Sequence, residues 1–65
     1  MTINEARKLS VGEYVVRNGE KLEISAINEH KSWTSGKSIV YITCKDKYGY
    51  EIKFSHKELQ TMKGV

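Results

Sequence analysis

The chain has 65 residues, of which 38% are apolar and 29% charged, and its formal net charge is +3. A chain of this length forms one domain, residues 1–65, and buries only about 60% of its unfolded surface. Its one cysteine excludes an intrachain disulfide, and one cysteine with two distant histidines does not match the ligand spacing of a structural zinc site. We therefore expect a fold that needs no disulfide, metal or cofactor.

No segment reaches the roughly 18 consecutive apolar residues of a membrane span. The first residues lack the apolar region of a signal peptide. A single unpaired cysteine fits a reducing compartment. We expect a cytoplasmic protein with no membrane partner.

The N-terminal half predicts a helix followed by a β-hairpin. Thr2 and Glu5 have the spacing of a capping box, which predicts a short helix over residues 3–8. Residues 14–16 are typical of a strand, and Asn18-Gly19 is a strong hairpin signal. Apolar alternation predicts a returning strand over residues 21–27, in which Ile27 falls out of phase and indicates a bulge or bend.

The C-terminal half predicts a loop, a second hairpin and a last strand. Residues 28–38 are polar and show no period, so we expect a loop there. Residues 39–45 and 50–54 alternate as two strands joined by a glycine turn. Residues 55–58 form a second capping box that predicts one helical turn, and residues 60–65 fit a short final strand.

Alternation and helix-end positions also predict the core. In the strands Tyr14 and Tyr50 fall in phase with core positions, so we expect both to pack inside. The expected core residues are Leu9, Tyr14, Val16, Leu22, Ile24, Val40, Ile42, Ile52, Phe54 and Leu59.

From Leu9 to Val65 the chain resembles SH3-like barrels. The resemblance rests on the start Leu9-x-x-Gly12-x-Tyr14-Val15, the Asn18-Gly19 turn, the glycine-closed strand pair and the helical turn ending in Leu59. It implies a mainly β fold: a small five-stranded SH3-like barrel with a short N-terminal helix and one helical turn before the last strand. Within that superfamily the chain is most similar to small phage or mobile-element proteins of unassigned function.

Two related families fit less well. The chain is also similar to Sm-like proteins of the bacterial host-factor type, but it lacks their signature at the second and last strands. The aromatic and acidic loop of signalling SH3 domains is missing, which argues against proline-rich ligands. Small barrels host many functions, so the fold alone decides little.

Trp33 is the most informative single residue. It lies in the polar segment beside Lys31 and Lys37. A tryptophan among lysines suits base stacking or a protein-interface anchor. The alternative is that Trp33 folds back to cap a core that has few large side chains, and the two interpretations weigh about equally.

Lys45, Lys47 and Tyr48 form a second basic and aromatic cluster at the predicted hairpin tip. Solvated turn residues have the same composition, and that interpretation weighs more. In an SH3-like barrel the loops after the second and third strands can share one rim. If they do here, the binding residues Lys31, Trp33, Lys37, Lys45, Lys47 and Tyr48 would form one surface.

Catalysis is not indicated. His30 and His56 are expected at the surface, and Cys44 shares a face with Val40 and Ile42, so we expect a buried, unreactive thiol. The four glycines that precede residue 50 are explained by turns rather than by a phosphate-binding loop.

Charge leaves two binding functions open. Residues 1–30 have a balance of −1, and residues 31–65 one of +4. We expect a non-catalytic binding module, a protein-interaction or regulatory adaptor whose partner is a protein. The alternative is a nucleic-acid-binding protein that uses a Sm-like or Tudor-like barrel through its lysine-rich C-terminal half.

Overall fold

The computed structural model describes residues 1–62. The elements in chain order are α1 (Ile3–Arg7), β1 (Tyr14–Arg17), β2 (Glu20–Lys31), β3 (Ser38–Lys45), β4 (Glu51–Ser55), the 3-10 turn η1 (His56–Glu58) and β5 (Gln60–Thr61). The mainly β fold, the short N-terminal helix and the helical turn before the last strand are confirmed. The last strand is shorter than predicted, and residues 63–65 of that prediction lie outside the described residues.

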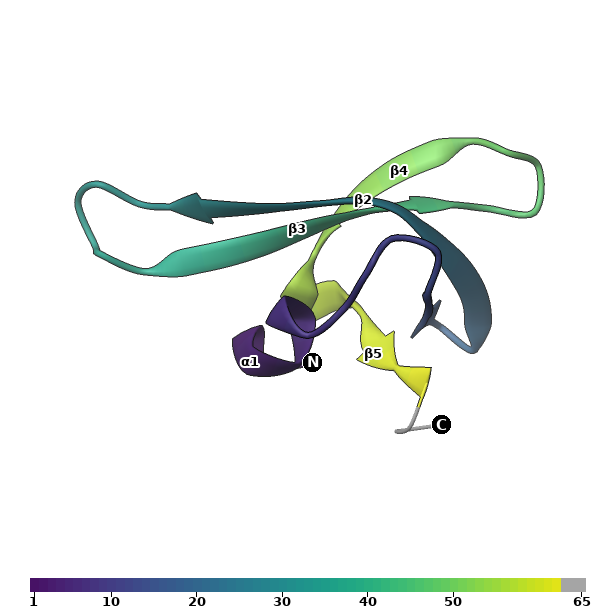
Figure 1. The fold of residues 1–65 in the computed structure, drawn as a ribbon, viewed down its shortest axis with the longest axis horizontal. Helices are drawn as coiled ribbons and strands as arrows, with labels where there is room; N and C mark the ends of the chain where they lie inside the picture. The colour runs from purple at the N-terminus through teal and green to yellow at the C-terminus, as the bar shows by residue number, and fades with distance from the viewer. Residues whose placement is uncertain (63–65) are drawn as a thin grey trace.

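The five strands form one antiparallel sheet in the order β4-β3-β2-β1-β5. Within residues 1–62 the edge strands β4 and β5 do not pair, so the sheet is open and its strands do not close the expected barrel. β2 bends strongly toward β1, and α1 and β5 lie on the concave side of the sheet (Figure 1). The concave side holds the core.

The predicted capping box starts α1. The backbone N–H of Thr2 donates to Glu5 Oε1 at 2.8 Å, and the N–H of Glu5 donates to Thr2 Oγ1 at 3.2 Å. A helix of five residues is not stable alone. Burial of Ala6 and a 2.7 Å bond from the Met1 ammonium to the Leu59 carbonyl hold it to the rest of the fold.

The first hairpin follows its sequence signal. Asn18 and Gly19 both adopt positive φ, 53° and 79°, as the predicted tight turn requires. The bulge of β2 lies between Ile24 and Ala26 rather than at Ile27. Because of this extra residue Ile27 lies opposite Ile42 and returns to the concave face.

The predicted loop over residues 28–38 is wrong. β2 continues to Lys31 and β3 begins at Ser38, so only residues 32–37 connect them. β1 covers β2 only as far as Glu23, and β4 covers β3 only from Tyr41 onward. Residues 28–40 are therefore a two-stranded projection, here called the ribbon, which reaches one end of the molecule (Figure 1).

The core differs in membership from the predicted one. Tyr14 and Ile52 were expected inside but are 43% and 45% exposed, and Leu9 is only partly buried. Ile52 does face the concave side, opposite Cys44, but nothing within residues 1–62 covers it fully. The observed core cluster comprises Ala6, Val15, Leu22, Ile24, Val40, Ile42, Cys44, Phe54 and Leu59.

Three further side chains correct or refine the predictions. Tyr50 was expected to pack inside but is exposed, because it lies in the turn beyond the paired part of β4. His56 was expected at the surface but is buried, and its Nδ1 accepts a 3.2 Å bond from the Val40 N–H. Val16 is buried as predicted, although it lies outside the main core cluster.

Candidate binding surfaces

The turn of the ribbon holds Trp33 out in solvent. Its side chain is 100% exposed, which contradicts the interpretation that it caps the core. The Ser32 N–H donates to the Lys37 carbonyl at 2.8 Å, and the Gly36 N–H donates to the Ser32 carbonyl at 3.1 Å. Gly36 has a φ of +68°, which a glycine adopts without strain. The turn is thus closed by its own backbone, and Trp33 projects from a hydrogen-bonded frame.

Lys31 and Lys37 lie on either side of the turn that carries Trp33. Lys31 lies directly opposite Ser38 in the β2–β3 register, and Lys37 precedes Ser38. Glu29, the one carboxylate of the ribbon, forms a bidentate ion pair with Arg7 of α1, with both N···O distances 3.0 Å. Within residues 1–62 no carboxylate lies within 4.0 Å of the Lys31 or Lys37 ammonium. We call Lys31, Trp33 and Lys37 the ribbon tip.

The Arg7–Glu29 pair fastens α1 to the base of the ribbon. Hydrogen bonding to Arg7 holds the pKa of Glu29 below its ordinary value of 4.5. Because the folded-state pKa is depressed, this stabilisation is present above the pKa of the unfolded state and is lost as the pH falls through the folded-state pKa. The side chains are about half exposed, so the contribution is small.

We expect Glu29→Gln to lower the melting temperature slightly at neutral pH and hardly at all once Glu29 is protonated. Thermal melts of both proteins across the acid range would measure the difference. Glu20→Gln, at the opposite end of the molecule, is the matched control and should show no such dependence. A melting-temperature difference that persists in acid would contradict this role of the pair.

The second predicted cluster, at the β3–β4 turn, is exposed but not strongly basic. Lys45 is paired in register with Glu23 on one side and Glu51 on the other. Asp46 Oδ1 accepts the backbone N–H groups of Tyr48 and Tyr50 at 2.8 and 3.0 Å. These carboxylates offset the positive charges of Lys45 and Lys47. Tyr48 is 74% exposed, with the Lys47 ammonium 5.2 Å from its ring centroid.

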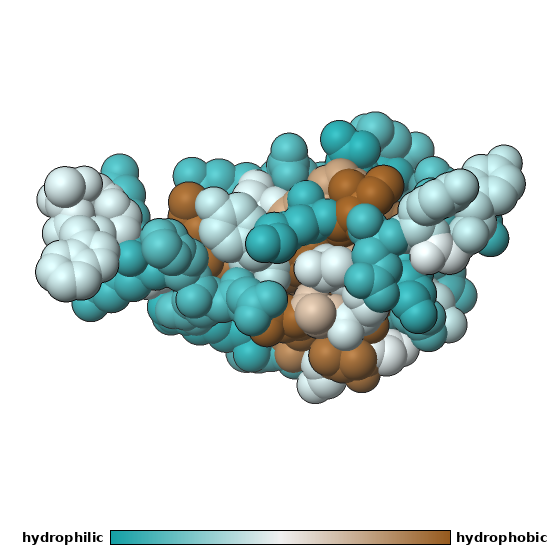
Figure 2. Space-filling model, turned by 90° about the horizontal axis from the view of Figure 1, so that it is seen from above, coloured by the Kyte–Doolittle hydropathy of each residue, from teal (hydrophilic) through white to brown (hydrophobic). Residues whose placement is uncertain are grey.

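The structure does not bring the two clusters onto one rim. The ribbon turn precedes β3 and the second turn follows it, so the eight residues of β3 separate them by about 23 Å. They lie at opposite ends of the long axis in Figure 1. Figure 2 shows pale side chains of intermediate hydropathy at both narrow ends, and between them a surface on which hydrophilic side chains alternate with hydrophobic patches. The six predicted binding residues therefore belong to two separate surfaces.

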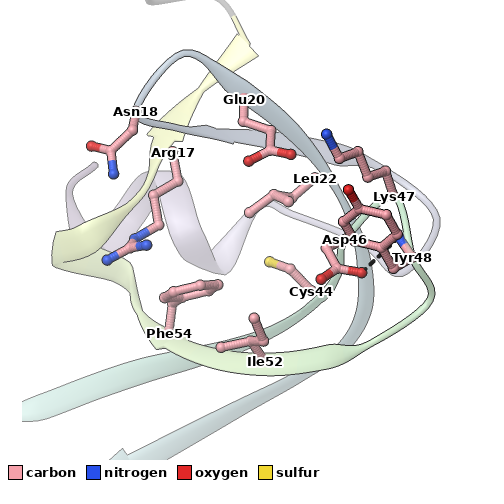
Figure 3. A pocket seen from close by; sticks show the side chains of 10 residues that line it. All are labelled: Arg17, Asn18, Glu20, Leu22, Cys44, Asp46, Lys47, Tyr48, Ile52 and Phe54. Carbon is pink, nitrogen blue, oxygen red and sulfur yellow. Dashed lines mark hydrogen bonds between the residues drawn. The ribbon is translucent and has the colours of Figure 1, made fainter.

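Lys47 and Tyr48 border a cavity that the sequence did not reveal. We call this cavity, which lies between the β1–β2 and β3–β4 hairpins, the mouth (Figure 3). Its volume is about 310 Å³. The lining residues are Arg17, Asn18, Glu20, Leu22, Cys44, Asp46, Lys47, Tyr48, Ile52 and Phe54.

The mouth combines an apolar floor with Arg17, which forms no ion pair within residues 1–62. Leu22 of β2 and the β4 residues Ile52 and Phe54 meet on the concave face of the sheet (Figure 3). The Arg17 guanidinium carbon lies 4.6 Å from the Phe54 ring centroid. Arg17 and Glu20 are partners in the β1–β2 register, yet they form no ion pair. Arg17 and Glu20 flank the Asn18-Gly19 turn, which the sequence predicts. Their position near β4 depends on the bend of the sheet, and no local sequence pattern predicts that bend.

Cys44 is buried as predicted, and burial raises the pKa of its thiol. Within residues 1–62 no three His, Cys, Asp or Glu side chains are placed to hold a metal ion. No helix in the same range is long and apolar enough to cross a membrane.

Comparisons of the chain with protein-family models, curated proteins and solved structures returned no significant match.

Proposed function

We propose that this protein is a non-catalytic binding module that anchors a protein partner through the ribbon tip. The observation that carries the proposal is the complete exposure of Trp33 on a hydrogen-bonded turn. A tryptophan buries about 150–250 Å² when it packs, so leaving it in water forgoes the largest hydrophobic contribution one side chain can make. Tryptophan is also among the residues most enriched at the energetic centres of protein interfaces.

The frame of the turn supports the same function. Binding costs conformational entropy when a loop must be ordered, and an ordered turn reduces that cost in advance. The Arg7–Glu29 pair adds a brace at the base of the ribbon. A prepared anchor on a projecting ribbon needs no cleft, which suits a chain too small to enclose a large pocket.

We also propose that the open sheet is a variant of the SH3-like barrel. The strand order, the bent β2 and η1 before β5 support it. In this proposal the barrel is incomplete where β4 and β5 diverge. An experimental structure that placed backbone hydrogen bonds between these two strands would show closure.

If Trp33 is an anchor, removing its ring should weaken partner binding without changing the stability of the fold. Trp33→Ala should reduce partner affinity by about 2 kcal/mol or more, roughly thirtyfold, and leave the melting temperature unchanged. The partner is first captured from a lysate of the source organism, then purified and titrated by calorimetry. Tyr48→Ala removes another exposed aromatic ring, at the other end of the molecule, and should bind like the parent protein. Equal affinity of the parent protein and Trp33→Ala would reject the anchor.

Nucleic acid is the second candidate, and the two uncompensated lysines favour it. Aromatic rings among basic side chains stack on unpaired bases, and Lys31 and Lys37 can contact phosphates. Titration of a labelled single-stranded oligonucleotide at several salt concentrations tests this. Binding that weakens with salt, and that Lys31→Ser with Lys37→Ser makes less salt-dependent, identifies a nucleic acid as the partner. Salt-independent or absent binding leaves the protein partner.

A further inference from the structure

We propose that the ribbon tip of one molecule docks into the mouth of a second copy of the same chain. One molecule carries both surfaces: an exposed aromatic ring on a turn that also holds two lysines, and a cavity whose lining includes Ile52, Phe54 and the Glu20 carboxylate. This proposal rests on the same exposed Trp33 as the proposed function, and it names the mouth of a second copy as a place where that ring binds. Self-association of this kind would keep Trp33 buried in the second copy until another partner displaces that copy.

Both surfaces leave apolar area uncovered. Trp33 is 100% exposed, and Ile52 on the floor of the mouth is 45% exposed although it faces the concave side of the sheet. They cannot cover each other within one chain, because β3 separates the two ends by about 23 Å. Contact between two copies covers both. The mouth, at about 310 Å³, lies at the small end of the size range of ligand pockets, which matches one large side chain rather than a folded segment.

The rim of the mouth suits an indole with positive neighbours. Arg17 presents one face of its guanidinium to Phe54. Its other face can stack on the entering Trp33 ring, since arginine pairs favourably with aromatic faces. Glu20 is exposed on the rim and lacks an ion-pair partner within residues 1–62. Lys31 or Lys37 of the entering ribbon can supply one.

Each contact joins the tip of one copy to the mouth of another. Copies joined head-to-tail extend into an open chain, and two antiparallel copies that exchange both contacts close as a dimer. An anchor this small makes a weak contact, so we expect association that rises with protein concentration.

Complementation between two variants tests the docking. Trp33→Ala lacks the tip but keeps the mouth, and Ile52→Arg places a long charged side chain in the mouth but keeps the tip. By analytical ultracentrifugation each variant alone should stay monomeric, whereas the parent protein self-associates. A mixture should form one-to-one dimers and stop there, since neither free end can add another copy.

The single tryptophan allows docking in the mixture to be followed by fluorescence. Only Ile52→Arg carries Trp33, so adding Trp33→Ala should shift its emission to shorter wavelength as the ring enters the mouth. Tyr50→Ala, on the same hairpin as the mouth, is the control and should associate like the parent protein. If Ile52→Arg does not fold, Glu20→Lys replaces it and should weaken parent self-association about twofold to fivefold.

The outcomes separate this inference from the proposed function. A mixture that stays monomeric, or variants that associate as the parent does, overturns docking between copies. If Trp33→Ala still loses its external partner in that case, the anchor stands and only its self-docking is wrong. If the mouth binds an added peptide while the parent protein stays monomeric at about 1 mM, a partner other than a second copy occupies it.

Discussion

Ile42→Ala should lower the free energy of unfolding by about 2–5 kcal/mol. Ile42 is fully buried in β3 and lies opposite Ile27 on one side and Phe54 on the other. Shortening it leaves a cavity between three strands that the sheet cannot easily collapse to fill. A domain of this size has only about 3–10 kcal/mol of stability in total, so the expected loss is a large share of it.

Ile52→Ala removes the same atoms from a half-exposed site and is the matched control. The strand pattern alone would predict an equal loss for Ile52, but its side chain is 45% exposed. We therefore expect only about 1 kcal/mol, because roughly half of its surface is already in water. Urea unfolding curves of both variants would measure the difference. Equal losses would show that the mouth is closed in solution.

His56→Phe should lower the free energy of unfolding by about 1–3 kcal/mol. The pairing of β3 with β4 ends at the pair of Tyr41 and Ser55. The N–H of Val40, the residue before Tyr41, therefore has no β4 carbonyl to bond and donates to His56 instead. His56 Nδ1 accepts that N–H at 3.2 Å, so the ring proton sits on Nε2. Phenylalanine keeps the ring but leaves a buried donor without a partner.

The effect should appear in two measurements. Each kilocalorie lost lowers the melting temperature by about 4–8 °C in a domain this small. The Val40 amide should also exchange its hydrogen faster, because its acceptor is gone. His30→Phe, at an exposed position of β2, is the control and should change neither. Unchanged exchange at Val40 in His56→Phe would show that His56 does not end the ladder.

Local signals predicted those parts of the fold that one segment determines. The two capping boxes formed as expected, and Asn18-Gly19 made its turn because both residues tolerate positive φ. The phase of β3 was also correct, since Val40, Ile42 and Cys44 all face the core. The phase of β1 was wrong: Tyr14 and Val16 were expected to share the core face, but Val15, opposite Leu22, joins the core cluster. The extent of the core was not predictable, because period-two alternation says which way Ile52 points but not whether another element covers it.

The ribbon escaped prediction for a physical reason. Asn28 to Lys31 are polar on both faces, because this part of the sheet lies beyond most of the core. Such residues show no alternation even when they pair as strand, and the bulge after Ile24 also shifts the phase. His56 was misjudged similarly, since its role as a ladder acceptor depends on where β4 ends.

The binding surfaces were predictable only in part. Sequence singled out Trp33 with Lys31 and Lys37, and Tyr48 with Lys45 and Lys47, as two clusters. It could not show whether Trp33 was core or surface, because a small domain often needs its one tryptophan inside. The separation of the clusters and the convergence of Arg17 with Phe54 depend on the bend of β2, a property of the whole sheet.

The most direct test of the central claim is the fluorescence of Trp33, the one tryptophan in the chain. In dilute protein, where copies are separate, we expect emission at the wavelength of a free tryptophan derivative in water, acrylamide quenching nearly as efficient, and little change on unfolding. Emission at shorter wavelength at every dilution, protected from acrylamide and moving to longer wavelength on unfolding, would contradict the account. Trp33 would then be packed in the fold, and the ribbon tip would not be an anchor.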